Sequence, residues 1–316
     1  MTFKEVAAVV LPPDPVSHRT VTFSKDGSHL LVGTNSFARH EVLGVLWVNW
    51  RTGQSLTREL PRDELKPDID SSALAVDVNG DLAIAVSGAY SAYRPDEEQL
   101  WLVRQTETNP PQLVHHSRKS GLVFSLSPDR THLLVGDSIS EQPRLEMFAL
   151  APFVATVRIP VTSGAKLYAV ALSNDLQHVA IATEHRVVCV GRDGKELCAW
   201  PNEPKLHFLS FAEDGLSLWG ISKDAVTHFP WKGAQVPFTI FGGRPWAFDT
   251  GTQRAVFLAP AGICEVNLSN GEVLVLGGGI RANAPFVDCC DVGRRRTAIL
   301  DYDGPSARIR VFEATS

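Results

Sequence analysis

Two cysteines lie symmetrically about a predicted turn, and their spacing could support thiol chemistry. Three residues separate Cys189 from the Asp193-Gly194 dipeptide, and three separate that dipeptide from Cys198. Asp-Gly between two strand-forming runs is a hairpin signal, and a two-residue loop would place the thiols opposite each other, close enough for a disulfide. The alternative is a pair of buried thiols that pack as small hydrophobic groups. We expect the second, because the chain has five cysteines and no recognisable secretory signal peptide.

Three histidines, His29, His132 and His178, could be taken for a metal or catalytic set. Each follows an apolar position by six residues in a similar segment, so they are equivalent positions of a repeat. Equivalent positions of a repeat lie apart in space, and we expect each histidine to be exposed at a turn between two strands. The basic run Arg294–Arg296 falls at the same kind of turn, where solvated surface is expected.

The elements that must position these residues repeat along the chain. The segment FSKDGSHLLVG at 23–33 returns as LSPDRTHLLVG at 126–136. Each copy has an apolar anchor, a turn with Asp, Asn or Gly three residues later, and a second apolar run. Seven anchors recur at intervals of 37 to 53 residues: Phe23, Val76, Leu126, Leu172, Phe211, Phe248 and Cys290. Together the copies account for residues 1–316, so we expect a single domain.

Each copy is expected to contain four short strands. The residue before the anchor is small in all seven copies, and the residue before that is large and apolar in six, which is the period-two pattern of a strand. The second half of each copy has the pattern of a hairpin, as in RVVCV-GRDGKE-LCAW. Seven copies of four antiparallel strands predict an all-β protein, a seven-bladed β-propeller. We expect residues 3–12 to be the outer strand of blade seven, so that the N-terminal strand closes the ring.

The repeated segment resembles the WD-repeat family. Copies in that family carry an apolar-Ala-Phe-Ser-Pro-Asp-Gly segment that leads into a second strand, and LSPDRTHLLVG and FSKDGSHLLVG are similar to it. The likeness extends over nearly the whole chain, although the Gly-His and Trp-Asp dipeptides of the family are absent. The resemblance implies a WD-repeat-like seven-bladed propeller in which the loops between second and third strands emerge on one face.

Two classes of function are compatible with such a propeller. We favour a non-catalytic scaffold or adaptor that binds another protein or peptide, on the prior that the fold gives. The alternative is a lactonase-like hydrolase with a divalent metal at the mouth of the central channel, built around His18, Asp70, His207 and Asp288. The seven residues that precede the first strands include one carboxylate, Asp70, whereas a divalent cation normally takes more oxygen ligands. The motifs GxSxG and HExxH and a phosphate loop are absent from the sequence, so no metal or other cofactor is expected.

The composition is that of a globular protein with a modest negative charge. Hydrophobic residues make up 44% of the chain, charged residues 21%, and the formal net charge is -5. A protein that binds nucleic acid or a membrane surface would need a basic field, so neither partner is expected. No apolar run approaches the roughly 18 residues of a membrane span. With no signal peptide recognisable, we expect a cytoplasmic protein.

The predicted docking patch lies on the loops between the second and third strands of the first three copies. These loops are long, GTNSFARHEVLG, SGAYSAYRPDEEQ and GDSISEQPR, whereas the fourth and fifth copies have only ATEHR and ISKDA. Loop length beyond what a turn needs often accompanies function, and aromatic and arginine side chains are favoured at binding hot spots. The patch is expected to contain Phe37, Arg39, His40, Tyr90, Tyr93 and Arg94, with Asp63 and Glu64 in its polar rim.

Overall fold

A computed structural model gives the fold of the chain. It describes residues 2–11, 16–24, 27–36, 44–61, 74–77, 82–91, 94–106, 110–118, 121–139, 144–161, 166–202, 205–212, 215–232, 237–241, 244–249, 254–259, 262–267, 272–275, 286–291, 296–303 and 306–315. Within these ranges the regular elements are β-strands, and no helix is long and apolar enough to span a bilayer. The chain divides into two compact units. The first comprises Met1–Lys119, Pro260–Glu265 and Val273–Ser316, and the second comprises Ser120–Ala259 and Val266–Glu272.

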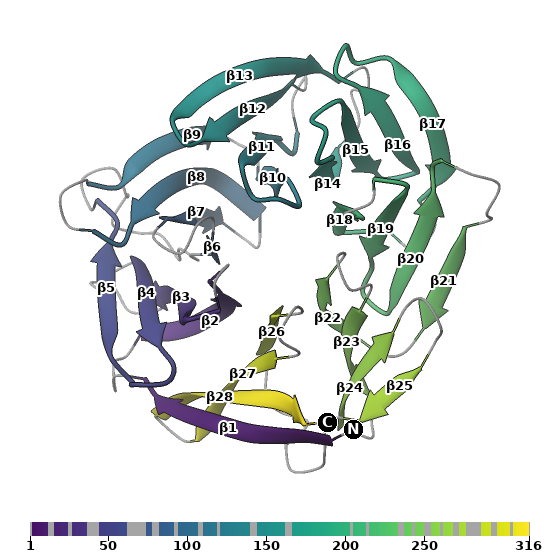
Figure 1. Cartoon of the computed structure of the whole chain (residues 1–316). Helices are drawn as coiled ribbons and strands as arrows, with labels where there is room; N and C mark the ends of the chain where they lie inside the picture. The colour runs from purple at the N-terminus through teal and green to yellow at the C-terminus, as the bar shows by residue number, and fades with distance from the viewer. Residues whose placement is uncertain are drawn as a thin grey trace. The chain divides into compact units, whose positions relative to one another are not determined.

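Three four-stranded antiparallel sheets lie in the first unit (Figure 1). One contains, in order, β2 (Val16–Phe23), β3 (His29–Ser36), β4 (Gly44–Asn49) and β5 (Ser55–Glu59). The next contains β6 (Leu74–Asp77), β7 (Leu82–Ser91), β8 (Arg94–Arg104) and β9 (Gln112–Arg118). The third has the order β1 (Thr2–Val10), β28 (Ser306–Thr315), β27 (Arg296–Asp303) and β26 (Phe286–Asp291).

Three further sheets of the same kind lie in the second unit. They contain β10 (Leu122–Leu126), β11 (His132–Asp137), β12 (Arg144–Leu150) and β13 (Phe153–Pro160); β14 (Leu167–Leu172), β15 (His178–Thr183), β16 (Arg186–Gly191) and β17 (Glu196–Pro201); and β18 (Phe208–Phe211), β19 (Ser217–Ile221), β20 (Ala225–Pro230) and β21 (Phe238–Phe241). A seventh sheet has the order β22 (Arg244–Asp249), β23 (Arg254–Ala259), β24 (Gly262–Asn267) and β25 (Val273–Val275). Repeated four-stranded antiparallel sheets, as the sequence predicts, are therefore confirmed.

Burial explains why the strands differ in sequence. β4 reads GVLWVN and β19 reads SLWGI, and nearly every residue of both is buried. β5, at the edge of its sheet, alternates between exposed and half-buried residues. A middle strand that is covered on both faces takes apolar side chains at every position, whereas an edge strand keeps the period-two pattern.

Neighbouring sheets of the first unit share apolar clusters. Val9, Val21 and Val311 are buried in one cluster, which joins the sheet that contains β1 to the sheet β2–β5. Trp47 and Trp101 are almost completely buried in another, between the sheets β2–β5 and β6–β9. Aromatic side chains of this size supply much of the apolar area that such small sheets can bury.

A row of four small residues crosses the sheet β14–β17, with one residue on each strand. Ala171 pairs with Ala180, Ala180 with Cys189, and Cys189 with Cys198. The first three are completely buried in a cluster that includes Phe211 of the sheet β18–β21, and Cys198 packs against that cluster. Small side chains along the row leave space for the aromatic side chains of the neighbouring sheet.

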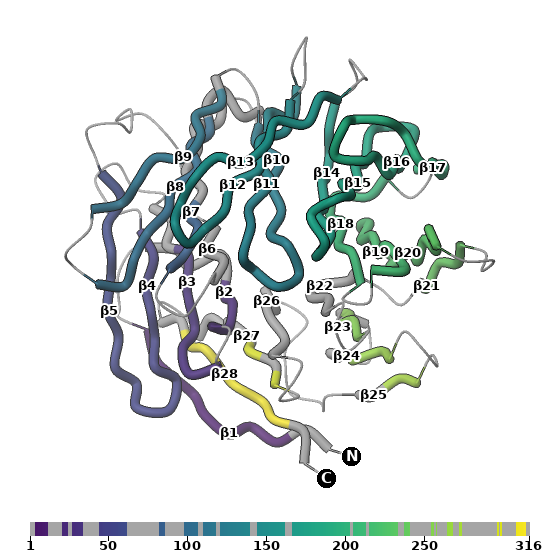
Figure 2. The backbone as a smooth tube through the Cα atoms, turned by 45° about the horizontal axis from the view of Figure 1, so that its top comes forward, coloured from purple at the N-terminus to yellow at the C-terminus, as the bar shows by residue number. Residues whose placement is uncertain are grey.

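The N-terminal strand pairs with the last strand of the chain. β1 runs antiparallel to β28, with Thr2 opposite Thr315. Both views show β1 beside β28, at the edge of their sheet (Figure 1, Figure 2). Arg310 Nη2 lies 2.5 Å from Glu5 Oε2, and Val9 is buried. Segments from opposite ends of the sequence thus build one sheet.

The segment 87–99 is mostly strand, which corrects the expectation of a long irregular loop. β7 continues to Ser91, β8 begins at Arg94, and these two residues are register partners. Only residues 92–93 separate the two strands. Apart from Pro95, which has no backbone N–H, this pairing gives the backbone groups of the extension hydrogen-bond partners that an irregular loop would have to find elsewhere.

Candidate functional site

Two residues of the predicted docking patch lie in the described part of the chain. Tyr90 is on β7, opposite Pro95, and Arg94 is the first residue of β8, opposite Ser91. Both are therefore next to the tip of one hairpin. The other residues of the patch lie outside the described residues: Phe37, Arg39, His40, Asp63, Glu64 and Tyr93.

In the registers of the described residues, the β7–β8 hairpin extends past the paired parts of β6 and β9. β6 pairs with β7 only from residue 83 to residue 86, and β9 pairs with β8 only from residue 97 to residue 102. In the registers of the described residues, positions 90–91 and 94–95 therefore pair only with each other. The tip is a two-stranded extension that carries an aromatic and an arginine residue.

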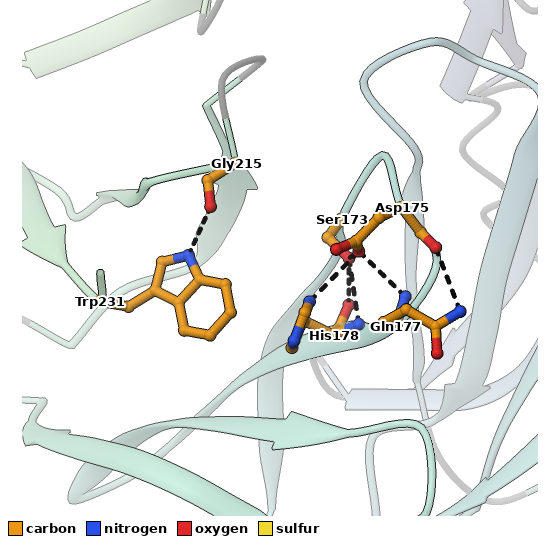
Figure 3. A network of polar contacts seen from close by, with 6 residues as sticks. All are labelled: Ser173, Asp175, Gln177, His178, Gly215 and Trp231. Carbon is orange, nitrogen blue, oxygen red and sulfur yellow. Dashed lines mark hydrogen bonds and ion pairs between the residues drawn. The ribbon is translucent and has the colours of Figure 1, made fainter. Parts of the chain in front are cut away.

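A hydrogen-bonded turn connects β14 to β15 (Figure 3). Ser173 Oγ donates to Asp175 Oδ1 over 2.6 Å and accepts from the backbone N–H of His178 over 3.0 Å. Asp175 Oδ1 also accepts from the backbone N–H of Gln177 over 3.0 Å and lies 3.2 Å from His178 Nδ1. One carboxylate oxygen thus satisfies several donors of the turn and fixes the start of β15.

The same turn recurs in the sheet β10–β13. Ser127 Oγ donates to Asp129 Oδ1 over 2.5 Å, and the backbone N–H of His132 donates to Ser127 Oγ over 3.0 Å. The backbone N–H of Asp129 reaches Asn174 Oδ1 of the next sheet over 2.9 Å. The repeated sequence segment therefore encodes a repeated set of hydrogen bonds.

The fourth residue after the anchor has a left-handed backbone in four described copies. These residues are Gly27, Arg130, Leu176 and Gly215, with φ between 57° and 66°. A residue other than glycine costs about 1–2 kcal/mol there. The two copies with Arg130 and Leu176 are those in which the described Ser–Asp hydrogen bond holds the turn.

Trp231 connects the turn of one sheet to the next sheet. The ring centroids of His178 and Trp231 are 4.4 Å apart, and the indole N–H of Trp231 donates to the Gly215 carbonyl over 3.0 Å (Figure 3). Lys232 Nζ lies 4.1 Å from the centroid of the same indole. The His178 side chain is only 18% exposed. The expectation of an exposed histidine is wrong at this position, because aromatic packing against the neighbouring sheet covers it.

An equivalent contact in the first unit joins Trp50 to Arg296. The indole N–H of Trp50 donates to the Gly27 carbonyl over 3.0 Å, and the Arg296 guanidinium lies 5.1 Å from the indole centroid. Arg296 Nη2 also lies 3.0 Å from Glu313 Oε1, and the arginine side chain is 9% exposed. The expectation of solvated surface is therefore wrong for Arg296, which packs on an indole and pairs with a carboxylate.

Ser173, Asp175 and His178 have the residue types of a catalytic triad but a different geometry. In a triad the imidazole accepts the serine proton. Here the Ser173 hydroxyl donates its hydrogen bond to the carboxylate of Asp175, which when ionised can only accept, and His178 Nδ1 faces the same carboxylate oxygen. The group is arranged to hold a turn and not to activate a nucleophile.

The hydrogen bonds of these turns favour the charged form of the aspartates. Burial alone would raise the pKa of Asp175, but the hydrogen bonds from Ser173, a backbone N–H and His178 together lower it from its usual value. The pKa of Asp129 is lowered by the same balance, with Ser127 as the main hydrogen-bond donor. Both turns therefore favour an ionised carboxylate.

The residues of the hydrolase alternative lie on separate elements. His18 is on β2, Asp288 is on β26, and His207 is exposed directly before β18. Asp70 lies outside the described residues. Among the residues that the structure describes, no three His, Cys, Asp or Glu side chains are arranged to share a metal ion.

Cys189 and Cys198 lie opposite each other in the β16–β17 hairpin, as the Asp-Gly turn predicts. The loop between the strands, residues 192–195, is longer than two residues, and a register irregularity after Cys189 compensates for the difference. Both side chains are thiols; that of Cys189 is buried and that of Cys198 is half-buried.

Comparison with known proteins finds a likeness in fold without a likeness in sequence. No protein-family model and no curated protein matches the chain. Among the solved structures that match is the crystal structure of Raptor from Chaetomium thermophilum, with a TM-score of 0.66 and 10% sequence identity. The match covers 99% of this chain and 29% of that one. With its repeated four-stranded antiparallel sheets, the chain is thus similar in fold to part of that structure.

Proposed function

We propose that the chain is a non-catalytic scaffold that binds another protein or peptide. The observation that supports this best is the β7–β8 hairpin, which extends past the paired parts of β6 and β9 with Tyr90 and Arg94 next to its tip. The likeness in fold to Raptor supports the same class. The Ser–Asp–His group of the described turns adds no nucleophile that would favour an enzyme.

In this proposal residues 1–316 form one seven-bladed propeller of the WD-repeat-like kind. Each four-stranded sheet is one blade, and the regular spacing of the sequence anchors supports the count. The pairing of β1 with β28 supports a ring in which the N-terminal strand is the outer strand of blade seven. A closed ring protects sheet edges that would otherwise pair with other chains.

The proposed docking patch combines the hairpin tip with the long segments of the first two copies. Its residues are Phe37, Arg39, His40, Tyr90, Tyr93 and Arg94, with Asp63 and Glu64 at the rim. Aromatic side chains bury large areas at low conformational cost, and aromatic and arginine side chains together dominate the binding energy at protein interfaces. A patch of this composition suits a protein or peptide partner better than a small polar ligand.

Joint substitution of Tyr90, Tyr93 and Arg94 by alanine is expected to abolish capture of the partner. The hairpin tip pairs only within itself in the described registers, so the melting temperature should stay nearly unchanged, with an effect on stability of about 0.5 kcal/mol or less. Affinity capture from the native cell, quantified by mass spectrometry against the unsubstituted chain, measures the first effect. A thermal melt measures the second.

A matched control is the double substitution Glu184→Ala and His185→Ala. Both residues are exposed on the short turn between β15 and β16, which is the equivalent turn of another sheet. Capture by this control variant should equal that of the unsubstituted chain. Full capture by the triple variant, or loss only in the control, would place the docking surface elsewhere.

A further inference from the structure

We propose that Cys189 and Cys198 form a reversible oxidation site, at which a hydroperoxide converts the two thiols into a disulfide between β16 and β17. The site goes beyond the scaffold function and does not depend on it. It rests on the register of the hairpin, on the exposure of the two side chains and on the contact between the two thiols.

The register places the two residues at a separation that a disulfide can span. Cys189 and Cys198 are direct partners in the antiparallel pair β16–β17. Directly opposed residues in antiparallel strands have Cα atoms about 4.5 Å or about 5.5 Å apart, according to whether they exchange backbone hydrogen bonds. Both separations fall inside the range of roughly 4.4–6.8 Å that disulfides span. A disulfide is therefore within reach of the two side chains, at a position directly before the register irregularity of the hairpin.

The two thiols differ in access to solvent. Cys189 is completely buried, whereas Cys198 is half-buried at the outer end of the row that begins at Ala171. A small oxidant can thus reach Cys198 from the edge of the sheet, whereas Cys189 lies on the next strand inward and is covered. This is the arrangement of an attacking thiol and a resolving thiol.

The difference in burial assigns the same roles. Burial raises the pKa of the Cys198 thiol, and the hydrogen bonds from the thiol and the backbone of Cys189 oppose this increase. Burial and the neighbouring Cys198 raise the pKa of Cys189 to about 12. Cys198 is therefore the better nucleophile of the two.

The reaction balances with one hydroperoxide. The Cys198 thiolate attacks the peroxide oxygen, the S–O bond forms, the O–O bond breaks, and the leaving oxygen takes up a proton. The Cys189 sulfur then attacks the Cys198 sulfenic acid, the S–S bond forms, and the hydroxyl leaves as water with the Cys189 proton. Two thiols are oxidised by two electrons in total, and the peroxide is reduced by two.

Peptide mapping of the oxidised protein tests the proposal directly. The folded full chain is treated with hydrogen peroxide, the remaining thiols are alkylated, and the protein is digested with trypsin. Cys189 and Cys198 then fall in the separate peptides 187–192 and 196–205. We expect these two peptides to be joined, at the mass of their sum less two hydrogens, and to separate after treatment with a dithiol reductant.

Two variants make the result specific. Cys264→Ala removes a buried thiol elsewhere in the chain and should leave the cross-linked peptide in place, whereas Cys198→Ala should abolish it. The proposal is overturned if Cys198 is oxidised without the cross-link, if the cross-link forms only in denaturant, or if either thiol pairs with another cysteine. Because the mapping uses the unsubstituted chain, it stands even if a variant fails to fold.

Discussion

Trp50 and Trp231 each follow the third strand of their sheet and donate to a glycine carbonyl in the turn between the first two strands of the same sheet. Each indole also contacts the first residue of a second strand in a neighbouring sheet, Arg296 or His178. Each tryptophan side chain therefore connects the end of its own third strand to a turn of the same sheet and to an adjacent sheet. Its N–H group and its ring act on different partners, so their contributions can be separated by substitution.

Trp231→Ala is expected to lower the free energy of unfolding by about 3 kcal/mol, because it removes a large ring from the contact with His178 and leaves the Gly215 carbonyl without its donor. Trp231→Phe keeps an aromatic ring and should cost only about 1 kcal/mol, the value of the lost hydrogen bond. Urea denaturation of the two variants measures both values. Equal losses in both variants would show that the hydrogen bond, and not the ring, carries the contact.

The carboxylate of Asp175 should make stability depend on pH in the acid range. Its pKa is lowered in the folded chain, so its stabilising effect is complete above the pKa of the unfolded chain, about 3.9, and is lost as the pH falls through the lower folded value. Asp175→Asn should therefore be less stable than the unsubstituted chain at pH 7, and the difference should shrink below about pH 4.

Denaturation midpoints of both proteins at several pH values between 7 and 3 measure this effect. Asp224→Asn, on an exposed turn, serves as the control for replacing an aspartate by asparagine. A difference between Asp175→Asn and the unsubstituted chain that stays constant down to pH 3 would contradict the role given to the charge.

Among the elements, β1 is the strand whose removal tests the architecture most directly. Deletion of residues 1–12 would expose the edge of β28 and remove Val9 and Leu11, which are both buried. We expect the free energy of unfolding to fall by about 4 kcal/mol or more, because two buried apolar side chains are lost together. The melting temperature and the solubility of the truncated chain measure the effect.

The matched control for the deletion is Glu5→Gln, which removes only the ion pair with Arg310. A partly exposed ion pair contributes about 0–1 kcal/mol, so this variant should melt close to the unsubstituted chain. An unchanged melting temperature after the deletion would mean that the pairing of β1 with β28 does not contribute to stability.

The sequence predicts the elements better than their contacts with other sheets. The alternation around Ala171 and the Asp-Gly turn after Cys189 predict a strand and a hairpin that the structure contains. The contact of His178 with Trp231 could not be predicted in this way, because it depends on which residue of a neighbouring sheet faces the turn. A signal for it exists: in both known cases the tryptophan is followed by a basic residue, Arg51 or Lys232, directly after a third strand.

The sequence also fails to predict the extension of β7 and β8, here because of the local composition of the segment. The segment around Tyr90 contains glycine, proline and charged residues, which favour a loop when each is considered singly. The strands continue because the residues before and after the tip can pair with each other, from Ser87 with Gln99 to Ser91 with Arg94, with one register irregularity between Ala89 and Tyr90. Residue propensities cannot predict a hairpin that is stabilised by the backbone hydrogen bonds between its own two strands.

At the scale of the whole molecule, the sequence repeat and the match to a solved structure indicate the same kind of fold. The detailed contacts depend on the individual side chains. Seven four-stranded sheets follow the seven sequence anchors, and the chain matches part of Raptor over 99% of its own length with 10% identity. A similar fold at such low sequence identity is possible because the sheets need only apolar side chains of suitable size at buried positions. The hairpin tip, the indole contacts and the cysteine pair are details that the fold alone does not determine.

The pairing of β1 with β28 also sets the order in which the chain can fold during synthesis. Most strands find their partner among sequence neighbours and can pair soon after they leave the ribosome. β1 is made early, but Arg310, the partner of Glu5, follows 305 residues later. At roughly 5–20 residues per second, β1 waits on the order of 15–60 seconds with its edge unpaired. Of the described strands, β1 is therefore the one with the longest opportunity to pair with another nascent chain.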